Sequence, residues 1–319
     1  MPRPSSSSRS TGARAPKTIE PTHKLTRPDT RVYVGDCRDV LAALPDTFDL
    51  IFADPPFNWK RDYDRWEKGG AWDDDIPEDD YIEFTERWLD LCVERLADHG
   101  ALWVNIPDTW AAEIVVHLKK RRLKMVNWCV WHYRFGQNTK GRFINSKVHA
   151  LYFMKDPTHP ERRWNADDIL EVSDRRAIYN DKRTETKKDG IEAGHRLPMD
   201  VWYGDKFWGR VQGNNKERRH KHDNQLPEVY LGRIIAACSH EGDRVLDPFL
   251  GSGTTGVVAR ALKRRFVGID FSELNAEHAF DRIKAGPART REQLLGQLRG
   301  QSTAIHPRRV RGASNPDPA

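Results

Sequence analysis

The stretch VLDPFLGSGTTGVVARALKRR, Val245–Arg265, decides the fold, because it runs from a strand through a glycine turn into a helix. Gly251 and Gly253 permit tight backbone geometry and close approach of a ligand, and the start of the helix offers unpaired N–H groups. The next strand, RRFVGID, ends at Asp270, where doubly wound folds place an acid for ribose hydroxyls. The alternative role of Asp270 is to cap the following helix. This succession predicts a parallel sheet with a ligand site at its strand ends.

The glycine turn departs from two common nucleotide motifs. No GK[ST] follows it, as a Walker A loop requires, so ATP hydrolysis is not predicted. Gly256 completes a GxGxxG spacing, but DPF directly before the turn is unusual for a nicotinamide enzyme. That class remains a distant alternative.

Outside this stretch, strand-like and helix-like segments alternate, which predicts a doubly wound, mostly parallel α/β sheet. We expect further strands at 31–36, 48–56, 101–106, 125–133 and 147–155. We expect helices at 37–45, 76–100, 108–121 and 226–239. In the helix at 76–100, Pro77 and acidic residues occupy the first turn and Gly100 ends the pattern. We interpret the acidic runs Asp73–Asp75 and Glu78–Asp80 as complementing the helix dipole on a solvated face rather than as a metal site.

The remaining segments lack this regularity. Residues 156–225 show no sustained period and are predicted to form an irregular insertion. Residues 1–30 are rich in Ser, Arg and Pro, which is typical of a disordered basic arm; a transit peptide has a similar composition, but no amphipathic pattern is present. Residues 287–319 form a second basic tail, with one short helix expected at 290–298. The formal net charge of +6 indicates a polyanionic partner.

Composition also bounds the location and the cofactor chemistry. No apolar run approaches the roughly 20 residues that cross a bilayer, so no membrane association is predicted. The four cysteines have no CxxC spacing. The two histidines in HKH at 220–222 lie in a basic loop and are expected to be solvated, so we expect no metal. A reducing cytoplasm is the predicted location.

A second distinctive stretch is DLIFADPPFNWK, Asp49–Lys60, in which a buried strand runs into Asp54 and two prolines. Prolines lock φ and disfavour helical geometry at the residue before them, so this backbone is extended and stiff. The loop is therefore predicted to hold the Asp54 carboxylate and the neighbouring carbonyls still.

Taken in order, DPPF and DPFLGSGTT resemble the β class of S-adenosylmethionine-dependent DNA amino methyltransferases, in the circularly permuted arrangement with the catalytic loop first. GDCRDVLAALPDTFDLIFADPP, VHALYFMK and LPEVYLGRIIAACSHEGDRVLDPF support the resemblance, which covers residues 31–154 and 225–285. It implies a Rossmann-like methyltransferase sheet that uses S-adenosylmethionine. It also implies that 31–155 is the catalytic half, 156–225 the target-recognition region and 226–286 the cofactor-binding half.

The resemblance implies a role for each matching residue. Asp36 should meet the adenine amino group of the cofactor, and Asp270 its ribose. The methionine end of the cofactor and the turn beneath it should be surrounded by Asp247, Phe249, Gly251, Ser252, Gly253 and Thr254.

The proline loop fits the chemistry of amine methylation. The exocyclic amine of a base is a poor nucleophile, because its lone pair is delocalised into the ring. The Asp54 carboxylate and the Pro55 carbonyl, held rigid by Pro55 and Pro56, are predicted to accept its two N–H bonds and localise that lone pair. Phe57 is predicted to stack on the base. Positioning is then the main requirement.

The predicted partner is double-stranded DNA, from which the base must be flipped to reach such a loop. Basic residues of the insertion are expected to hold phosphates: Arg175, Arg176, Lys216, Arg218 and Arg219. A solvated surface is the alternative explanation for these charges. Of the aromatic residues Trp202, Tyr203, Phe207 and Trp208, we expect most to pack the insertion together.

The leading hypothesis is a sequence-specific DNA methyltransferase acting on adenine N6. Cytosine N4 or an RNA base is the alternative acceptor, and a non-catalytic DNA-binding protein on the same scaffold is the alternative class. Intact Asp54, Pro55 and Pro56 argue against the latter. The sequence leaves open whether a restriction endonuclease partner or a homodimer exists.

Overall fold

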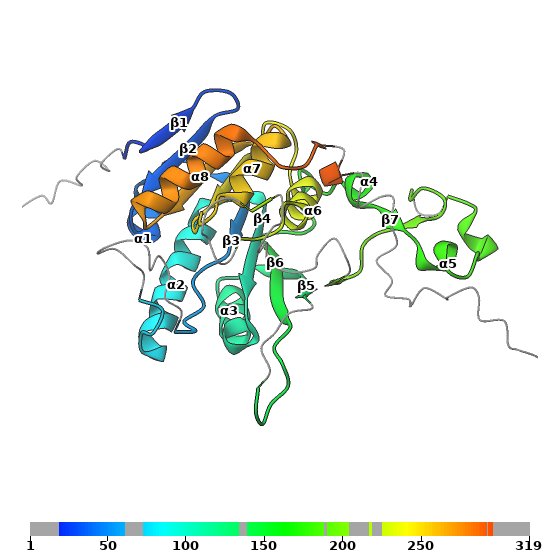
Figure 1. Cartoon of the computed structure of the whole chain (residues 1–319), viewed down its shortest axis with the longest axis horizontal. Coiled ribbons are helices and arrows are strands. Elements are labelled where there is room, and N and C mark those ends of the chain that lie inside the picture. The colour runs from blue at the N-terminus through cyan, green and yellow to red at the C-terminus, as the bar shows by residue number, and fades with distance from the viewer. Residues whose placement is uncertain are drawn as a thin grey trace, which may run out of the picture.

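The computed structural model describes residues 19–60, 73–133, 139–187, 190–203, 217–218, 225–291 and 293–295 (Figure 1). The strands are β1 His23–Leu25, β2 Thr30–Val34, β3 Phe48–Ala53, β4 Leu96–Ile106, β5 Lys124–His132, β6 Lys147–Met154, β7 Glu171–Val172, β8 His195–Arg196, β9 Val201–Trp202, β10 Arg244–Asp247 and β11 Arg265–Asp270. The helices are α1 Cys37–Ala43, α2 Glu78–Arg95, α3 Asp108–Lys120, α4 Ala166–Ile169, α5 Asp174–Ala177, α6 Glu228–Cys238, α7 Thr254–Ala261 and α8 Glu273–Ala285, with a 3₁₀ turn η1 at Lys182–Thr184.

A nine-stranded sheet forms the centre, in the order β1-β2-β11-β10-β3-β4-β6-β5-β9. The pairs from β2 through β11, β10 and β3 to β4 are parallel, whereas β6 pairs antiparallel with both β4 and β5. Helices α1, α2 and α3 contact one another in turn, as do α6, α7 and α8, which is the arrangement expected when helices cover both faces of a doubly wound sheet. The predicted fold class is confirmed.

The strand order determines where a ligand site lies. Strands β10 and β3 are neighbours in the centre of the sheet. The strand that follows β10 in the sequence, β11, lies on one side of this pair, and the strand that follows β3, β4, lies on the other. The crevice of such sheets opens at the carboxyl ends of the strands where the order diverges. Asp247 ends β10, and Asp54 follows β3 directly. The two motifs far apart in the sequence therefore meet at this edge.

Helix α2 ends earlier than the predicted range 76–100. It stops at Arg95, and Leu96 is extended and begins β4. Gly100 lies inside β4, where a Cβ would come within 3.0 Å of the Phe48 carbonyl oxygen. Glycine is therefore needed at position 100 because β3 approaches closely, not because a helix stops there. The sequence could not distinguish the two cases, since a lone glycine is compatible with both.

Ordered structure continues past both predicted ends of the domain, and residues 291 and 293–295 are helical, within the range 290–298 where a short helix was expected. Residues 23–25, assigned to the disordered arm, form the edge strand β1 and pair with β2. In the tail, Leu294 is fully buried and its backbone approaches Gly232 of α6. The described ordered region therefore extends beyond the predicted boundaries 31 and 286.

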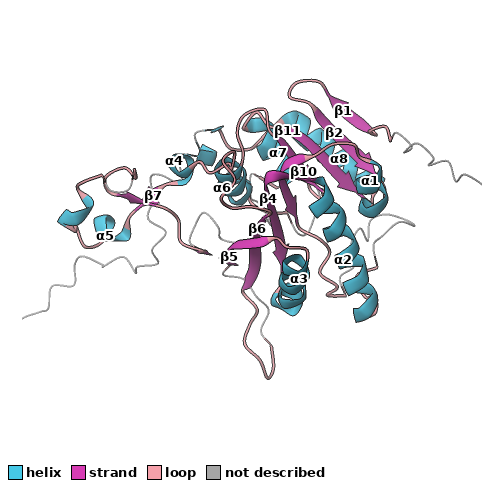
Figure 2. Ribbon diagram, turned by 180° about the vertical axis from the view of Figure 1, so that it is seen from behind, coloured by secondary structure: helices cyan, strands magenta, loops and turns pink. Residues whose placement is uncertain are grey.

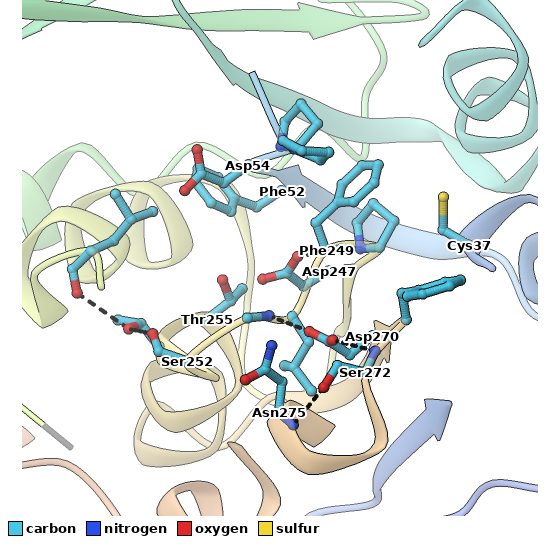
Figure 3. A pocket seen from close by; sticks show the side chains of 18 of the residues that line it. Cys37, Phe52, Asp54, Asp247, Phe249, Ser252, Thr255, Asp270, Ser272 and Asn275 are labelled. Atoms are coloured by element: carbon cyan, nitrogen blue, oxygen red, sulfur yellow. Dashed lines mark hydrogen bonds between the residues drawn. The ribbon is translucent and has the colours of Figure 1, made fainter. Parts of the chain in front are cut away.

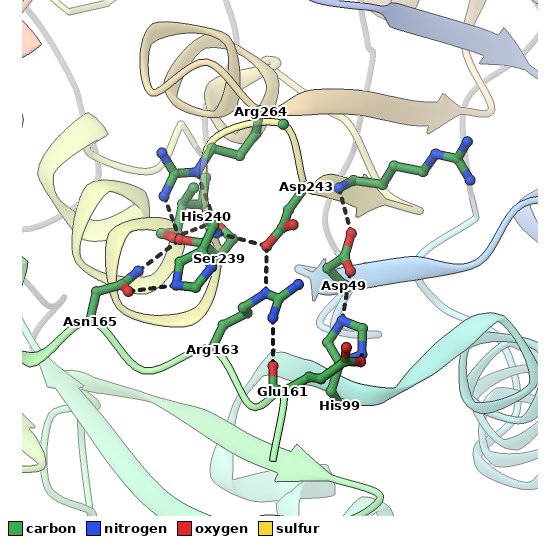
Figure 4. A network of polar contacts seen from close by, with 12 residues as sticks. Asp49, His99, Glu161, Arg163, Asn165, Ser239, His240, Asp243 and Arg264 are labelled. Atoms are coloured by element: carbon green, nitrogen blue, oxygen red, sulfur yellow. Dashed lines mark hydrogen bonds and ion pairs between the residues drawn. The ribbon is translucent and has the colours of Figure 1, made fainter. Parts of the chain in front are cut away.

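The insertion begins by docking on the amino edge of the sheet (Figure 4). Arg163 donates to Asp243 at 3.2 Å, and the side chain of Asn165 donates to the carbonyls of Ala236 and Ser239 at 2.7 and 2.8 Å. Farther on, β7 and α5 are set apart from the sheet, beyond α4 and α6 (Figures 1 and 2). In the part of the chain that the structure describes, no helix has the length and apolar character needed to cross a membrane.

A buried ion pair connects three segments behind the glycine turn. Glu228 at the start of α6 pairs with Arg282 of α8 at 3.2 Å, and both side chains are 1% exposed. Arg282 also donates to the Thr254 hydroxyl at 2.7 Å. The backbone N–H groups of Ala288 and Arg289 donate to the Glu228 carboxylate. The pair therefore holds α6, α8, the glycine turn and the start of the tail together.

Removing one partner of this pair is expected to destabilise the fold. We predict that Glu228→Ala lowers the free energy of unfolding by about 3 kcal/mol, because Arg282 is left buried without its counter-charge. Urea denaturation followed by circular dichroism measures the change. Glu277→Ala, at an exposed position of α8, is the control and should change stability by less than about 0.5 kcal/mol. Equal stabilities of the two variants would contradict the assigned role of the pair.

Candidate active site

A cavity of about 160 Å³ opens at the carboxyl ends of β10, β3, β11 and β2 (Figure 3). Of the predicted catalytic and cofactor-binding residues, those that line it are Asp36, Asp54, Pro55, Pro56, Phe57, Asp247, Phe249, Gly251, Ser252, Thr254 and Asp270. Gly253 does not line it. The lining also includes residues that the sequence patterns did not single out, namely Phe84, Leu226, Thr255, Phe271, Ser272 and Asn275 among others. One cavity thus brings the proline loop and the glycine turn together.

The proline loop is held by hydrogen bonds to its carbonyls. Tyr81 of α2 donates its hydroxyl to the Pro56 carbonyl at 2.7 Å. Trp110 of α3 donates its indole N–H to the Phe57 carbonyl at 2.8 Å. Among the described residues, no hydrogen bond to the Pro55 carbonyl is found. The Pro56 and Phe57 carbonyls are therefore occupied, whereas the Pro55 carbonyl is available to a ligand.

A clamp from the acidic run closes the far side of the loop. The Asp74 carboxylate accepts the backbone N–H groups of Asn58 and Trp59 at 2.8 and 2.9 Å. Asp74 is 2% exposed, so its interpretation as part of a solvated acidic face was wrong. The sequence could not distinguish it from its exposed neighbours Asp73 and Asp75, because only the returning chain brings it against the loop.

Phe57 lies at the cavity wall and is 2% exposed. Its ring meets Trp59 edge-on, with centroids 5.2 Å apart. The ring is thus fixed in place by packing before any ligand arrives.

The carboxylate of Asp54 is oriented by residues that the sequence patterns missed. The side-chain amide of Asn105, near the end of β4, donates to Asp54 Oδ1 at 2.7 Å. Tyr230 of α6 in turn donates to Asn105 Oδ1 at 3.0 Å. A polar residue in the apolar strand ALWVNI was the available signal for Asn105, because buried polar groups in such strands require partners.

Asp247 is a second carboxyl group in the same cavity, with a different environment. Burial raises its pKa to about 7, and the negative charge of Asp54 contributes in the same direction. Hydrogen bonds from the Thr255 side chain and the Phe249 N–H partly oppose this shift in pKa. The Asp247 carboxyl group is therefore harder to ionise than an exposed aspartate.

Asp270 ties the glycine turn to the end of β11. Its carboxylate accepts the N–H of Gly251 at 2.7 Å and the N–H of Ser272 at 2.9 Å. Its carbonyl accepts the N–H of Gly35 at 2.9 Å. The N-cap of α8 is Ser272, whose hydroxyl accepts the Asn275 N–H, so the capping role considered for Asp270 falls to its neighbour.

Asp36 lies at the opposite side of this edge, after β2. It caps α1 by accepting the Arg38 N–H at 2.8 Å, and it forms an ion pair with the Arg38 side chain. The hydrogen bond from the guanidinium lowers the pKa of Asp36, so this carboxyl group stays ionised.

An aromatic wall formed by Phe84, Trp88 and Phe249 lies between the strand ends, with Phe249 edge-on to both other rings.

Gly253 supports the site from behind. It is the N-cap of α7 and has a φ of +76°, a conformation that favours glycine. A Cβ at this position would lie 2.9 Å from the Ala279 Cβ and 3.1 Å from the Ala279 carbonyl oxygen. The absence of a side chain at Gly253 is therefore required by the close approach of α8, and its contact with a ligand stays a prediction.

The predicted DNA-contacting residues lie outside the cavity. Arg175 and Arg176 are exposed on α5, and Arg176 pairs weakly with Glu185 at 3.5 Å. Arg218 is half-buried, next to Glu217, which is buried and accepts the Glu228 N–H at 2.9 Å. Lys216 and Arg219, and likewise Phe207 and Trp208, lie outside the described residues.

Potential metal ligands gather elsewhere. Within the described ranges, the side chains of His99, His159 and Glu161 form one group with ligand atoms within 4.8 Å of one another. It lies at the amino edge of the sheet, where His99 contacts Asp49 at 2.7 Å (Figure 4). At the cavity itself, Cys37 is buried and burial raises the pKa of its thiol, so it is protonated at neutral pH.

The doubly wound sheet with a cavity at its carboxyl edge is the arrangement of proteins that bind nucleotide-like ligands, and here the proline loop lines the same cavity. The family model of the N6/N4 DNA methylases matches residues 48–281, from β3 into α8. The chain therefore belongs to the DNA methylase family. Asp36 precedes the matched region.

Individual proteins show the same relationship. Type II methyltransferase M.HpaI of Haemophilus parainfluenzae is 31% identical over 253 residues, which are 77% of this chain and 73% of that protein. Type II methyltransferase M.BamHI of Bacillus amyloliquefaciens is 30% identical over 292 residues, 88% of this chain but only 63% of the relative.

Among solved structures, the fold is similar to PvuII DNA methyltransferase, described as cytosine-N4-specific, with a TM-score of 0.57 and 13% identity. The likeness covers 91% of this chain and 99% of that one. It is also similar to TTHA0409 of Thermus thermophilus, with a TM-score of 0.51 and 20% identity over 81% and 96% of the two chains. At these identities the likeness concerns the fold.

The steric role of Gly253 can be separated from its backbone conformation. Gly242 also has positive φ, +86°, but a Cβ there meets nothing within 4 Å. We predict that Gly253→Ala lowers the free energy of unfolding by about 1–3 kcal/mol more than Gly242→Ala does, because only Gly253→Ala overpacks against α8. Chemical denaturation of the two variants measures this difference. Equal losses would show that backbone strain is the whole effect.

Proposed function

We propose that the protein transfers a methyl group from S-adenosylmethionine to the exocyclic amine of a flipped base in double-stranded DNA, with adenine N6 as the acceptor. The observation that carries the proposal is the single cavity lined by Asp54–Phe57, by Asp247–Ser252 and by Thr254. A methyl donor and an acceptor amine must meet in one place, and this cavity is where the two loops do so. Membership of the DNA methylase family supports the same reaction.

The residues present suit S-adenosylmethionine. Asp270 and Asp36, at neighbouring strand ends, offer carboxylates of the kind that bind ribose hydroxyls and an adenine amine. Asp247 is a buried carboxyl group that a cationic ligand would favour in its ionised form. Phe249 offers an apolar surface between them. When bound, S-adenosylmethionine supplies an electrophilic methyl group on a sulfonium.

The acceptor side uses the proline loop. The two N–H groups of the amine donate hydrogen bonds to the Asp54 carboxylate and the Pro55 carbonyl, and this localises the lone pair of the amine nitrogen. Tyr81 and Trp110 keep the loop from moving by holding its next two carbonyls. Phe57, already fixed by packing, stacks on the base. The loop therefore orients the nucleophile and needs no covalent intermediate.

Adenine is proposed as the acceptor because the loop begins with aspartate. Within the resembling family, DPP plus an aromatic residue accompanies adenine targets, whereas serine in the first place usually accompanies cytosine N4. A carboxylate is the stronger, charge-assisted acceptor for the amine. Cytosine N4 is the second candidate, since the similar PvuII fold belongs to a protein described as cytosine-N4-specific.

The insertion at 156–225 is proposed to select the target sequence. Arg175 and Arg176 are exposed on α5, in the region set apart from the sheet, so their side chains are accessible to DNA phosphates. Arg218, with the undescribed Lys216 and Arg219, is proposed to extend this contact. A restriction endonuclease partner, a homodimer and a cytoplasmic location are compatible with the proposal and are not needed for it.

The reaction is tested with methyl-labelled S-adenosylmethionine and mixed-sequence double-stranded DNA. We predict N6-methyladenine as the labelled nucleoside, identified by mass spectrometry after digestion. N4-methylcytosine as the dominant product would overturn the choice of base while leaving the reaction class intact. Labelled RNA alone would overturn the DNA substrate.

Asp54→Ala is predicted to lower the methylation rate about 100- to 1,000-fold, because an oriented acceptor of the amine N–H is lost. Calorimetric affinity for S-adenosylmethionine should stay within a few-fold. Asp79→Ala, in the exposed first turn of α2, is the matched control and should retain full activity. Activity of Asp54→Ala above a few per cent of wild type would refute the proposed role.

The affinity for S-adenosylmethionine is predicted to rise with pH up to about 7 and then level off, because the raised pKa of Asp247 keeps this group protonated below that value. Below about pH 7 the slope approaches tenfold per pH unit if binding requires the ionised form. Asp247→Asn should abolish the slope. In the absence of ligand the sign is reversed: folded Asp247 holds its proton more tightly than the unfolded chain, so its contribution to stability falls as pH rises from 3.8 to about 7. Titration calorimetry from pH 5.5 to 8.5 measures the affinities, and a flat profile would contradict the assignment.

A further inference from the structure

We propose that Asn105 and Tyr230 are positioning residues for the reaction, forming a buried hydrogen-bond chain that sets the orientation of the Asp54 carboxylate. The inference rests on the proposed function, because it concerns how Asp54 receives the amine. Asn105 donates to Asp54 Oδ1 at 2.7 Å, and Tyr230 donates to Asn105 Oδ1 at 3.0 Å. Asn105 and Tyr230 are both completely buried.

The chemistry of the three groups gives the chain one direction. An ionised carboxylate only accepts hydrogen bonds, so the amide of Asn105 must turn its NH₂ group toward Asp54. Its carbonyl oxygen then faces Tyr230, whose hydroxyl must donate to it. Removing the Tyr230 hydroxyl leaves this buried carbonyl without its donor and frees the amide to reorient. The orientation of Asn105, and through it that of Asp54, thus depends on Tyr230.

Both supporting residues are themselves rigid. Asn105 sits in the central strand β4, paired with Ala150 of β6. The Tyr230 ring is packed against Trp131 and Trp202, with centroids 5.0 and 5.4 Å away, and edge-on to Phe52. A side chain enclosed on three sides cannot move its hydroxyl far. The chain therefore anchors Asp54 to the sheet and to α6, not to the surface loop alone.

Asp54 needs this support because of its electrostatic environment. Asp247 from β10 faces it across the cavity, and the charge of Asp54 acts to raise the pKa of Asp247. The Asn105 amide from β4 counters this repulsion by donating directly to the carboxylate. Tyr230 from α6, whose own pKa is raised by burial and by Asp54, remains a neutral donor. The chain thus stabilises an ionised Asp54 beside a second carboxyl group.

The outer end of the chain reaches the insertion. Trp202 of β9, which packs on Tyr230, also lies under the Arg233 guanidinium at 5.3 Å. Arg233 forms a buried ion pair with Glu171 of β7 at 3.1 Å. The wall that fixes Tyr230 is therefore built partly by residues 156–225, which explains how the hydroxyl is held in place on that side.

Tyr230→Phe is the sharpest test, because it removes one hydroxyl and keeps the ring. We expect kcat to fall about tenfold, the size of one lost buried hydrogen bond. The affinity for S-adenosylmethionine and the KM for DNA should change less than twofold. The acidic limb of kcat against pH should move to higher pH, since a carboxylate that loses donors holds its proton more tightly. Asn105→Ala should show the same changes, and the double variant should be no slower than Asn105→Ala.

Tyr152→Phe is the matched control. Tyr152 of β6 is 1% exposed, compared with 0% for Tyr230 of α6, and its hydroxyl donates to Met154 Sδ at 3.2 Å, away from Asp54. It should lose similar thermal stability but keep wild-type kcat and pH profile. If Tyr230→Phe behaves like Tyr152→Phe in kcat and pH profile, the positioning role is overturned.

A second readout does not require methyl transfer. Carbon-13 NMR titration of the Asp54 carboxyl, assigned by its absence in Asp54→Asn, should show a higher midpoint in Tyr230→Phe and Asn105→Ala than in wild type and Tyr152→Phe. An unchanged midpoint overturns the inference even if the enzyme is active. If the midpoint is raised in the two variants but the wild-type protein methylates no nucleic acid, the hydrogen-bond chain is supported and the proposed function is refuted.

Discussion

The parallel pairing of β10 with β3 is the constraint on which the site depends. These strands come from opposite parts of the chain, yet Val245 and Leu246 lie in register with Leu50 and Ile51. Because side-by-side parallel strands end at the same edge, Asp247 and Asp54 must face one cavity. A circularly permuted chain order changes which strand is made first but not which strands are neighbours. The same edge therefore forms whichever motif comes first in the sequence.

This juxtaposition creates an electrostatic problem, since two carboxyl groups share one cavity. The structure resolves it by giving them unlike surroundings. Asp54 receives a donor from Asn105, whereas Asp247 is buried and its pKa rises to about 7. Asp54 is thereby held in one orientation, whereas the ionisation of Asp247 depends on the charge of what binds beside it. Neighbouring carboxyl groups with such different environments are typical of functional sites.

Helix α6 connects the parts of the molecule. Glu228 in its first turn pairs with Arg282 and holds the glycine turn from behind. Tyr230 reaches the catalytic side through Asn105, and Arg233 reaches the insertion through Glu171. Three residues within two helical turns thus contact α8, the strand β4 beside the proline loop, and the insertion at 156–225. Their sequence, EVYLGR, reads as an ordinary buried amphipathic helix, so its connecting role was not predictable from it.

The sequence by itself determined the doubly wound sheet and the permuted order of the two motifs, because strand periodicity, glycine turns and proline stiffness are local properties. It did not single out several residues that line the cavity, among them Phe84, Thr255 and Asn275. It did not determine the buried role of Asp74, the end of α2 at Arg95 or the clash that makes Gly253 necessary. Nor did it reveal the chain from Tyr230 through Asn105 to Asp54. Each of these depends on partners distant in the sequence, and whether a polar residue faces water or a buried carboxylate is decided only when the sheet and helices pack together.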